Sequence, residues 1–248
     1  MTKLKEKVAV ITGGNSGIGL ATAKAFINAG ANVWITGRNA DTLKKASEEI
    51  NSPNLKTVVS DTSNLAGIAI LEKAIVESGD KLDILFINAG IAKLAPIAQM
   101  TEADFDAQFN TNVKGAYFTL QKMLPHLKDG ASILFNSSTN ATASSMGSSI
   151  YSATKGALNK IAKVAANELA ERKIRVNIIS PGPTLTPGLK NAVPTEALGY
   201  LASITALQRI GNPDEIAKVA LFLASDDASF ITGTEIIADG GQLNYALK

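Results

Sequence analysis

The sequence predicts an α/β fold in which a doubly wound, parallel sheet of seven strands carries helices on both faces. Two observations lead to this prediction. Apolar, strand-like runs alternate with helical patterns along the whole chain, and a glycine-rich turn joins the first of these runs to a helix. The 248 residues contain no obvious linker or internal repeat, and their number is within the usual range for one domain. We therefore expect a single domain over residues 1–248.

Short apolar runs rich in β-branched residues are the expected strands. They lie at Val8–Ile11, Val33–Thr36, Thr57–Val59, Ile84–Ile87, Ser132–Phe135, Arg175–Ile179 and Glu235–Ile237. Helical spacing of apolar residues predicts helices between them. These lie at Ala21–Ala29, Ala40–Ile50, Leu65–Glu77, Glu102–Leu124, Ser152–Glu171 and Asp214–Leu223. Because such sheets bind ligands beyond the carboxyl ends of their strands, residues that directly follow a strand are candidates for the site.

Composition excludes several classes of function. The formal net charge is only +2 and basic residues are scattered, so we expect no nucleic-acid binding. The chain has no cysteine, which excludes disulfides and thiolate chemistry. No stretch approaches the ~20 apolar residues of a membrane span, and no signal-peptide pattern follows Met1. We expect a cytoplasmic protein with no membrane or metal requirement, in which the single histidine, His126, lies at the surface.

The glycine-rich turn follows the first expected strand with the spacing G-x-x-x-G-x-G, at Gly13, Gly17 and Gly19. A strand, a turn and a helix in this order present free backbone N–H groups to a phosphate, and the helix N-terminus adds partial positive charge. Glycine is needed where the backbone approaches a pyrophosphate closely. The alternative is a merely structural tight turn. A P-loop is excluded because no Gly-Lys-Ser/Thr closes the motif.

Tyr151 and Lys155 lie four residues apart at the start of an Ala-rich helical run. A helix places these positions on one face, so the ammonium should lie near the phenol. A cation there would lower the pKa of Tyr151 and make the phenol a usable general acid or base. Most Tyr/Lys pairs with this spacing are solvated surface pairs, so the interpretation depends on the accompanying motifs.

Those motifs together resemble the short-chain dehydrogenase/reductase family. They are T-G-x-x-x-G-x-G from Thr12, Asn88-Ala89-Gly90 after the fourth strand, a serine before Y-x-x-x-K, and Pro181-Gly182 after the sixth strand. The resemblance extends from about Lys7 to Asp239-Gly240-Gly241. It implies a Rossmann-type fold and an oxidoreductase that transfers hydride between a nicotinamide dinucleotide and a small carbonyl or alcohol substrate.

The resemblance also implies four catalytic residues, which are Asn112, Ser138, Tyr151 and Lys155. Tyr151 would exchange a proton with the substrate oxygen, and Ser138 would donate a second hydrogen bond to it. Lys155 would bind the nicotinamide ribose, and Asn112 would hold a water that links Lys155 to solvent. Ser137 is a rival to Ser138, and only one of the two can face the site because neighbouring side chains at a strand end point to opposite faces.

The cofactor is expected to be NADP(H), with NAD(H) as the alternative. NAD-preferring sheets carry an acidic residue ~20 positions after the glycines, which binds the ribose 2′-OH. Here Gly37 takes that place and Arg38 follows, so a guanidinium is available for a 2′-phosphate. Ser16 is evidence against NADP(H), since strongly NADP-selective relatives often have a basic residue at this position. Arg38 could also be only a solvated loop residue.

Asp61 and Thr62 resemble the family's adenine-binding pair, although Asp61 could instead cap the next helix. The full set of residues expected to contact the cofactor is Gly13, Asn15, Ser16, Ile18, Gly19, Arg38, Asp61, Thr62, Asn88, Ala89, Gly90, Tyr151, Lys155, Pro181, Gly182, Thr184 and Thr186.

The segment 183–211 is long enough to be a mobile lid over the substrate. The expected pocket lining is mostly apolar, at Ile91, Ala92, Leu185, Leu189, Leu198 and Leu201, with Lys93 and Lys190 expected to be exposed. This favours a hydrophobic ketone or secondary alcohol, as for a carbonyl reductase or alcohol dehydrogenase. A 3-oxoacyl-thioester reductase and a sugar or polyol dehydrogenase are alternatives.

Two other classes fit the sequence less well. A non-catalytic dinucleotide-binding redox sensor would typically lack Tyr151 or Lys155, and an isomerase or dehydratase of the extended type would carry a longer C-terminal domain. The resemblance further implies a homotetramer in which the helix of Tyr151 packs on a partner. Alanines between Ala153 and Ala170 permit close helix approach, although alanine also simply favours helix.

Overall fold

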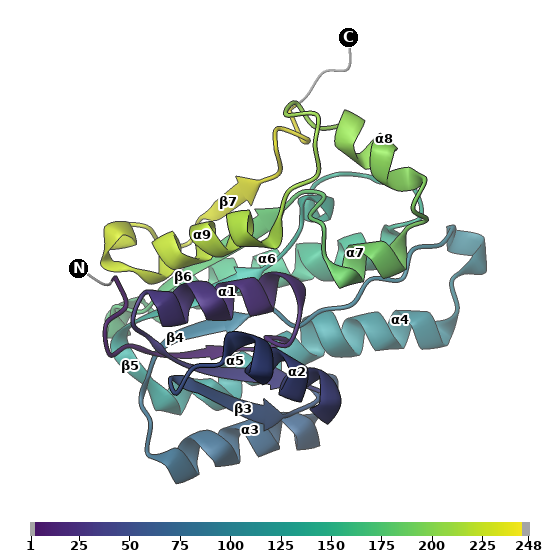
Figure 1. Ribbon diagram of the computed structural model, residues 1–248. Helices are drawn as coiled ribbons and strands as arrows, with labels where there is room; N and C mark the ends of the chain where they lie inside the picture. Colours follow the sequence, from purple (N-terminus) through teal and green to yellow (C-terminus); the bar gives the residue numbers. More distant parts are fainter. Residues whose placement is uncertain (1–2, 245–248) are drawn as a thin grey trace.

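The computed structural model describes residues 3–244. Its strands form a seven-stranded sheet in the order β3-β2-β1-β4-β5-β6-β7 (Figure 1). Every neighbouring pair is parallel. The strands are β1 Val8–Ile11, β2 Asn32–Gly37, β3 Leu55–Val59, β4 Leu82–Ile87, β5 Leu127–Asn136, β6 Arg175–Pro181 and β7 Glu235–Ala238. The prediction of a doubly wound parallel sheet is confirmed.

The strand order reverses between β1 and β4, which pair at the centre of the sheet with Ala9 opposite Ile84 and Ile11 opposite Phe86. The chain moves outward from β1 to β3 on one side of this pair and from β4 to β7 on the other. A crevice beyond the carboxyl ends of the strands opens at such a reversal, because the connections leave it in opposite directions. The fold therefore places the candidate site where β1 and β4 end.

Helices cover both faces of the sheet (Figure 1). They are α1 Gly17–Asn28, α2 Ala40–Ile50, α3 Leu65–Ser78, α4 Glu102–Phe109, α5 Ala116–Met123, α6 Ser149–Glu168, α7 Pro187–Ala192, α8 Ala197–Ser203 and α9 Pro213–Ala224. Apolar side chains of α1, α2 and α9 form one core cluster with the sheet, and those of α3, α5 and α6 form the other. Two buried cores on opposite faces hold the sheet between them and fix the position of its carboxyl edge.

The helices that follow β1 and β5 differ from those that follow β2, β3 and β4 in how their N-termini are capped. The Asn39 side chain caps α2, Asn64 caps α3, and Thr101 with Asp104 forms a capping box on α4. By contrast, Ser16 before α1 and Ser148 before α6 make no side-chain cap bond. The first N–H groups of a helix lack partners within the helix, so the N-terminus of α1 keeps free donors for a ligand.

The segment expected to be helical, Glu102–Leu124, is helical from Glu102 to Met123, but it is not a single α-helix. It consists of α4, a π-helical turn at Asn110–Gly115, and α5. A Cβ at Gly115 would lie 2.2 Å from the Thr62 carbonyl oxygen, so the backbone there is in direct contact with the segment after β3. The sequence Asn-Thr-Asn-Val-Lys-Gly does not distinguish a π turn from an α-helix, although such turns occur frequently at functional sites.

Other boundaries shift by a few residues. Strand β5 begins at Leu127 rather than Ser132, and α6 spans Ser149–Glu168 rather than Ser152–Glu171. The expected lid contains two short helices, α7 and α8. Its ends meet in a bridge between Thr184 and Gly211, so the segment leaves and rejoins the body of the protein at one place. Among the helices of residues 3–244, none has the length and apolar character needed to cross a membrane.

Candidate active site

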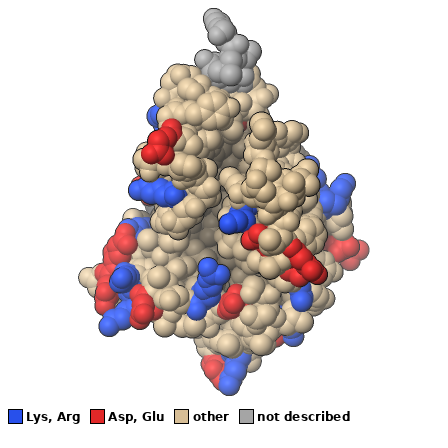
Figure 2. Space-filling view, turned by 90° about the vertical axis from the view of Figure 1, so that its right-hand side faces the viewer, with Lys and Arg blue, Asp and Glu red and all other residues tan. Residues whose placement is uncertain are grey.

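The residues predicted from the sequence lie at the carboxyl ends of β1 to β6, in the first turns of α1 and α6, and in the π turn at Asn110–Gly115. Figure 2 shows this face of the molecule, which is hollowed at its centre. Most of the surface around the hollow is neither acidic nor basic, and a few basic and acidic side chains lie at its margin (Figure 2).

The glycine loop packs directly on the segment after β4. A Cβ at Gly19 would lie 2.3 Å from the Gly13 carbonyl oxygen and 2.6 Å from Asn88 Nδ2. Gly13 and Gly17 have φ angles of 63° and 53°, which side chains rarely allow. A Cβ at Gly17 would lie 3.2 Å from Thr186 Cβ, so the loop also approaches the segment after β6. Larger residues at these positions would displace one of these neighbours.

The N-terminus of α1 fits a phosphate group. Ser16 is exposed and its hydroxyl caps no N–H of the helix, so both the hydroxyl and the first N–H groups remain available. Ile18, in the first turn, is partly buried. Unpaired donors together with the partial positive charge of a helix N-terminus form an anion site. The loop and helix therefore fit the pyrophosphate of a dinucleotide, as the sequence predicts.

Thr12 and Asn88 tie the ends of β1 and β4 together. The backbone N–H groups of Asn88 and Ala89 donate to Thr12 Oγ1 at 2.9 and 3.0 Å. Asn88 Nδ2 donates to the carbonyl oxygens of Thr12 at 2.8 Å and Gly13 at 3.2 Å. From the sequence, Thr12 is expected only to be part of the glycine motif. In the structure its hydroxyl is buried and orients the Asn88-Ala89 backbone.

Lys155 is buried in α6, with 4% of its surface exposed, and its Nζ donates to the Asn136 carbonyl oxygen at 2.8 Å. The Nζ atom lies 5.6 Å from the centre of the Tyr151 ring. A Cβ at Gly90 would lie 3.5 Å from Lys155 Nζ, which brings the backbone after β4 against the amine. The structure thus brings Tyr151, Lys155 and Gly90 together as the sequence predicts.

Asn112 holds the π turn against the site. Its Oδ1 accepts from the Ile91 N–H at 2.8 Å, and its Nδ2 donates to the Ile91 carbonyl oxygen at 2.8 Å and to Thr154 Oγ1 at 3.1 Å. The residue is buried, and Gly90 is close enough that a Cβ there would meet Asn112 Oδ1 at 3.3 Å. The side chain therefore fixes the loop after β4 relative to α6. It makes no direct hydrogen bond to Lys155.

Ser138 lies beside Tyr151, close enough for its side chain to lower the pKa of the phenol. Its Oγ accepts from the Asn140 N–H at 3.2 Å. Ser137 instead donates its backbone N–H to the Ile179 carbonyl oxygen at 2.7 Å, and its buried hydroxyl has no partner among the described residues. Of the two rival serines, the structure therefore places Ser138 against the phenol.

The predicted lowering of the pKa of Tyr151 by Lys155 is wrong. Burial raises the pKa of Tyr151, and the hydrogen bond with Ser138 offsets only part of this effect. The lysine amine is directed at the Asn136 carbonyl rather than at the phenol oxygen, so it does not counter the loss of hydration. Burial also lowers the pKa of Lys155 to about 8, since the ammonium loses water without gaining a carboxylate.

Asn15, Gly37 and Arg38 lie together at the end of β2. A Cβ at Gly37 would meet Asn15 Cγ at 2.9 Å, and Asn15 Nδ2 donates to Thr42 Oγ1 at 2.9 Å. Arg38 is exposed and makes no hydrogen bond or ion pair with any other residue of 3–244. Its guanidinium is therefore free to bind a ligand that reaches this strand end.

Asp61 and Thr62 follow β3 as expected. The Asp61 carboxylate accepts from the Ser63 N–H at 2.9 Å, whereas the cap of α3 is Asn64, which accepts from the Gly67 N–H at 2.8 Å. The alternative interpretation of Asp61 as a helix cap is therefore wrong. Thr62 is buried beneath the start of α5.

The segment after β6 approaches both the glycine loop and the C-terminal turn. Pro181 ends the strand opposite Ala238, and a Cβ at Gly182 would lie 2.6 Å from Asp239 Cα. Thr184 Oγ1 donates to the Gly182 carbonyl oxygen at 3.0 Å, and Thr186 caps α7 by accepting from the Leu189 N–H at 3.0 Å. Of this pair, Thr186 is the one that lies against the glycine loop.

The C-terminal turn contributes a contact that the sequence does not predict. Thr139 Oγ1, one residue after Ser138, donates to Gln242 Oε1 at 3.0 Å. The Asp239 carboxylate holds the turn by accepting from the N–H groups of Gly241 and Leu243, both at 2.8 Å. Gln242 stands directly after the Asp239-Gly240-Gly241 motif, but its sequence neighbourhood gives no sign that it reaches the site.

Comparison with known proteins identifies the family. A family model described as enoyl-(acyl carrier protein) reductase matches residues 13–242. A solved structure titled "short chain dehydrogenase/reductase family protein" superposes with a TM-score of 0.87 at 35% identity, over 96% of this chain and 98% of that one. The chain belongs to the short-chain dehydrogenase/reductase family. The resemblance stated from the motifs is confirmed, and the protein is an oxidoreductase of this family.

Two further relatives narrow the comparison to single-domain members of the short-chain dehydrogenase/reductase family. An uncharacterized oxidoreductase of Methylorubrum extorquens is 41% identical over 247 residues, which cover 97% of this chain and 99% of the relative. The structure of a 3-ketoacyl-(acyl-carrier-protein) reductase from Brucella melitensis, complexed with NADH, matches with a TM-score of 0.89 and 35% identity, over 96% of this chain and 99% of that one.

The buried amine of Lys155 should make stability depend on pH. Its pKa is about 8 in the folded protein against an ordinary value of 10.5, so between these values the unfolded chain binds more protons. Folding stability therefore rises with pH through this window. We expect the wild type to gain about 3 kcal/mol relative to Lys155→Met as the pH rises from 8 to 10.5. Urea unfolding of both proteins across this range measures the difference.

Lys160→Met is the matched control, because Lys160 lies on the same helix and is exposed. Removing an exposed, hydrated amine should leave the dependence of stability on pH almost unchanged. A Lys155→Met protein whose unfolding free energy ran parallel to that of the wild type would contradict the burial of a charged amine at this site.

Proposed function

We propose that the protein is an NADP(H)-dependent reductase of hydrophobic ketones, which also oxidises the corresponding secondary alcohols. The observation that carries the proposal is the meeting of Tyr151, Ser138 and Lys155 beside a dinucleotide-type glycine loop. The Ser138 contact with the phenol and the 2.8 Å bond from Lys155 to the end of β5 support it. Family membership supports the reaction class, and the residue roles are our assignment.

The residues that would hold the dinucleotide lie along the carboxyl edge. The free donors at the start of α1 would bind the pyrophosphate, and Arg38 would bind a 2′-phosphate. Asp61 and Thr62 would contact the adenine, and Asn88 to Gly90 would pass along the ribose. Pro181, Gly182, Thr184 and Thr186 would contact the nicotinamide side. When bound, the dinucleotide supplies or accepts the hydride.

Tyr151 would donate a proton to the substrate oxygen during reduction, and Ser138 would donate a second hydrogen bond to the same oxygen. These donors act where negative charge develops, so they stabilise the transition state more than the ground state. The raised pKa of Tyr151 keeps the phenol protonated near neutral pH, which suits the reductive direction. Lys155, whose pKa is about 8, would bind the nicotinamide ribose as a cation near neutral pH.

The lid supports an apolar substrate. Leu185 is 38% exposed and Tyr200 is 65% exposed, whereas Leu189, Leu198 and Leu201 are partly buried. Lys93 and Lys190 are exposed, so neither is held in place to clamp an acidic substrate. We infer that residues 183–211 close over the pocket. A 3-oxoacyl thioester is the second candidate substrate, because the Brucella melitensis relative is a 3-ketoacyl-(acyl-carrier-protein) reductase.

Removing the Tyr151 hydroxyl tests the catalytic assignment. We expect Tyr151→Phe to lose about 100-fold or more of kcat in the reduction of aryl ketones and β-keto esters, since general acid catalysis disappears. Its affinity for NADPH should change little, because the phenyl ring keeps the packing. Steady-state rates and NADPH fluorescence titration provide the two measurements. Normal turnover by the phenylalanine variant would overturn the mechanism.

Removing the Arg38 guanidinium tests the cofactor preference. We expect Arg38→Ala to raise the KM for NADPH by about 10- to 100-fold, because a charge-assisted pair of hydrogen bonds to the 2′-phosphate is lost. The KM for NADH should stay nearly constant. Equal effects on the two cofactors, or none, would show that Arg38 is only a solvated loop residue and would favour NAD(H).

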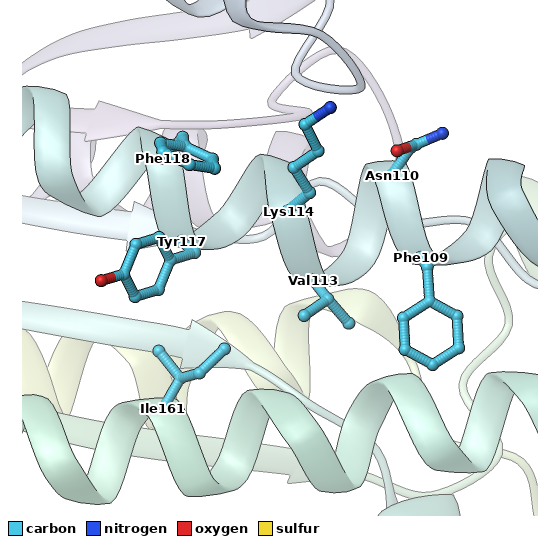
Figure 3. A pocket seen from close by; sticks show the side chains of 7 residues that line it. All are labelled: Phe109, Asn110, Val113, Lys114, Tyr117, Phe118 and Ile161. Atoms are coloured by element: carbon cyan, nitrogen blue, oxygen red, sulfur yellow. The ribbon is translucent and has the colours of Figure 1, made fainter.

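We also propose a homotetramer in which α5 and α6 pack against a partner. A shallow groove between these helices is lined by Phe109, Asn110, Val113, Lys114, Tyr117, Phe118 and Ile161 (Figure 3). Val113 and Ile161 project into it from opposite sides (Figure 3). Large apolar side chains continue past the groove, with Phe105, Tyr117 and Val164 each more than two-fifths exposed. Such contiguous apolar surface is typical of an interface.

A charge placed on this surface should break the assembly. We expect Val164→Glu to lower the molecular mass measured by light scattering to that of a dimer or monomer, because a carboxylate cannot be buried there without a partner. Val76→Glu is the matched control, since Val76 is similarly exposed but lies on α3. If both variants kept the mass of the wild type, this face would not be the interface.

A further inference from the structure

We propose that Asn136 is a positioning residue that aims Lys155 and links it mechanically to the dinucleotide loop. Asn136 is the last residue of β5 and precedes Ser137 and Ser138. Its backbone and its side chain bond to two different parts of the site. The role in catalysis rests on the function proposed above, but the mechanical link is a property of the folded protein.

The backbone carbonyl of Asn136 provides the hydrogen bond that fixes Lys155. Its distance to Nζ is 2.8 Å, and no other hydrogen bond or ion pair holds this amine within residues 3–244. An ammonium on a flexible four-carbon chain has many rotamers, so one fixed acceptor largely decides where it points. The direction of the Asn136 peptide group therefore sets the direction of the lysine.

The side chain of Asn136 fixes that peptide group. Its Nδ2 donates to Asn88 Oδ1 at 2.9 Å, and Asn88 in turn donates to the carbonyl oxygens of Thr12 and Gly13. A continuous series of hydrogen bonds thus runs from the first glycine of the loop to the catalytic lysine, across the ends of β1, β4 and β5. A dinucleotide that orders the loop would order Lys155 through the same contacts.

The side chain of Asn136 leaves one buried acceptor unused and makes its hydrogen bond to Asn88. Its Oδ1 is buried and accepts no hydrogen bond from the described residues. A buried acceptor without a partner destabilises a folded protein, so selection for stability alone would favour an apolar residue here. Asn177, one strand away, is the contrast. It is fully buried, and it both donates to the Ile231 carbonyl oxygen and accepts from the Thr234 N–H.

Asn136→Leu and Asn177→Leu form the matched pair for the first test. We expect Asn136→Leu to lower kcat about 100-fold, as for a misplaced catalytic group, and to shift the pH–rate profile. Its urea midpoint should stay closer to the wild-type value than that of Asn177→Leu. Asn177→Leu should keep the wild-type pH profile. If Asn136→Leu lost stability and activity together with an unchanged profile, Asn136 would be structural only.

A second measurement works without turnover. NADPH dissociation constants are measured for the wild type, Asn136→Leu, Lys155→Met and the double variant. If Asn136 acts through Lys155, the leucine should weaken binding about tenfold in the wild-type background and not at all in the Lys155→Met background. Additive effects would overturn the proposal. Asn136→Asp, which keeps the size but loses the donor, should behave like the leucine variant if that one fails to fold.

The two tests separate this inference from the proposed function. If the protein binds NADPH and the two substitutions are non-additive, but it reduces no ketone or thioester, the link between Asn136 and Lys155 is supported and the proposed reaction is overturned. If the Asn136→Leu variant reduces ketones at the normal rate, the reaction is supported and the link is overturned.

Discussion

The parallel pairing of β1 with β4 is the constraint on which the site depends. It places Gly13 and Asn88, 75 residues apart, within 3.2 Å of each other, and the side chain of Thr12 reinforces the contact. The helices α1 and α6 then bring a free helix N-terminus and a tyrosine to the same edge. The pairing of the strands thereby brings together groups that are far apart in the sequence.

Burial also determines the protonation of Tyr151 and Lys155. The same loss of water raises the pKa of Tyr151 and lowers that of Lys155, because burial disfavours the charged form of each group. The phenol is then a proton donor rather than a base, and the amine is poised to change its charge state just above neutral pH. Bound anionic groups nearby would restore the charge of the lysine, which couples the proton affinity of the site to its occupancy.

The sequence predicts the strands, the glycine loop and the Tyr151–Lys155 pair, because each depends on local periodicity or spacing. It does not predict the π turn at Asn110–Gly115, since the same residues suit an α-helix. It also misses Thr12 and Asn136, whose roles depend on which strands become neighbours. The sequence predicts the wrong direction for the pKa shift of Tyr151. Proximity along a helix does not reveal how deeply the phenol is buried or where the lysine amine points.

A crystal structure of the protein with bound NADP⁺ tests the central claim most directly. We expect the nicotinamide to lie beside Tyr151 and Ser138, with Lys155 Nζ within hydrogen-bonding distance of the ribose hydroxyls and the pyrophosphate at the start of α1. A dinucleotide bound with its nicotinamide remote from the Tyr151 hydroxyl, or with its phosphates away from the glycine loop, would contradict it.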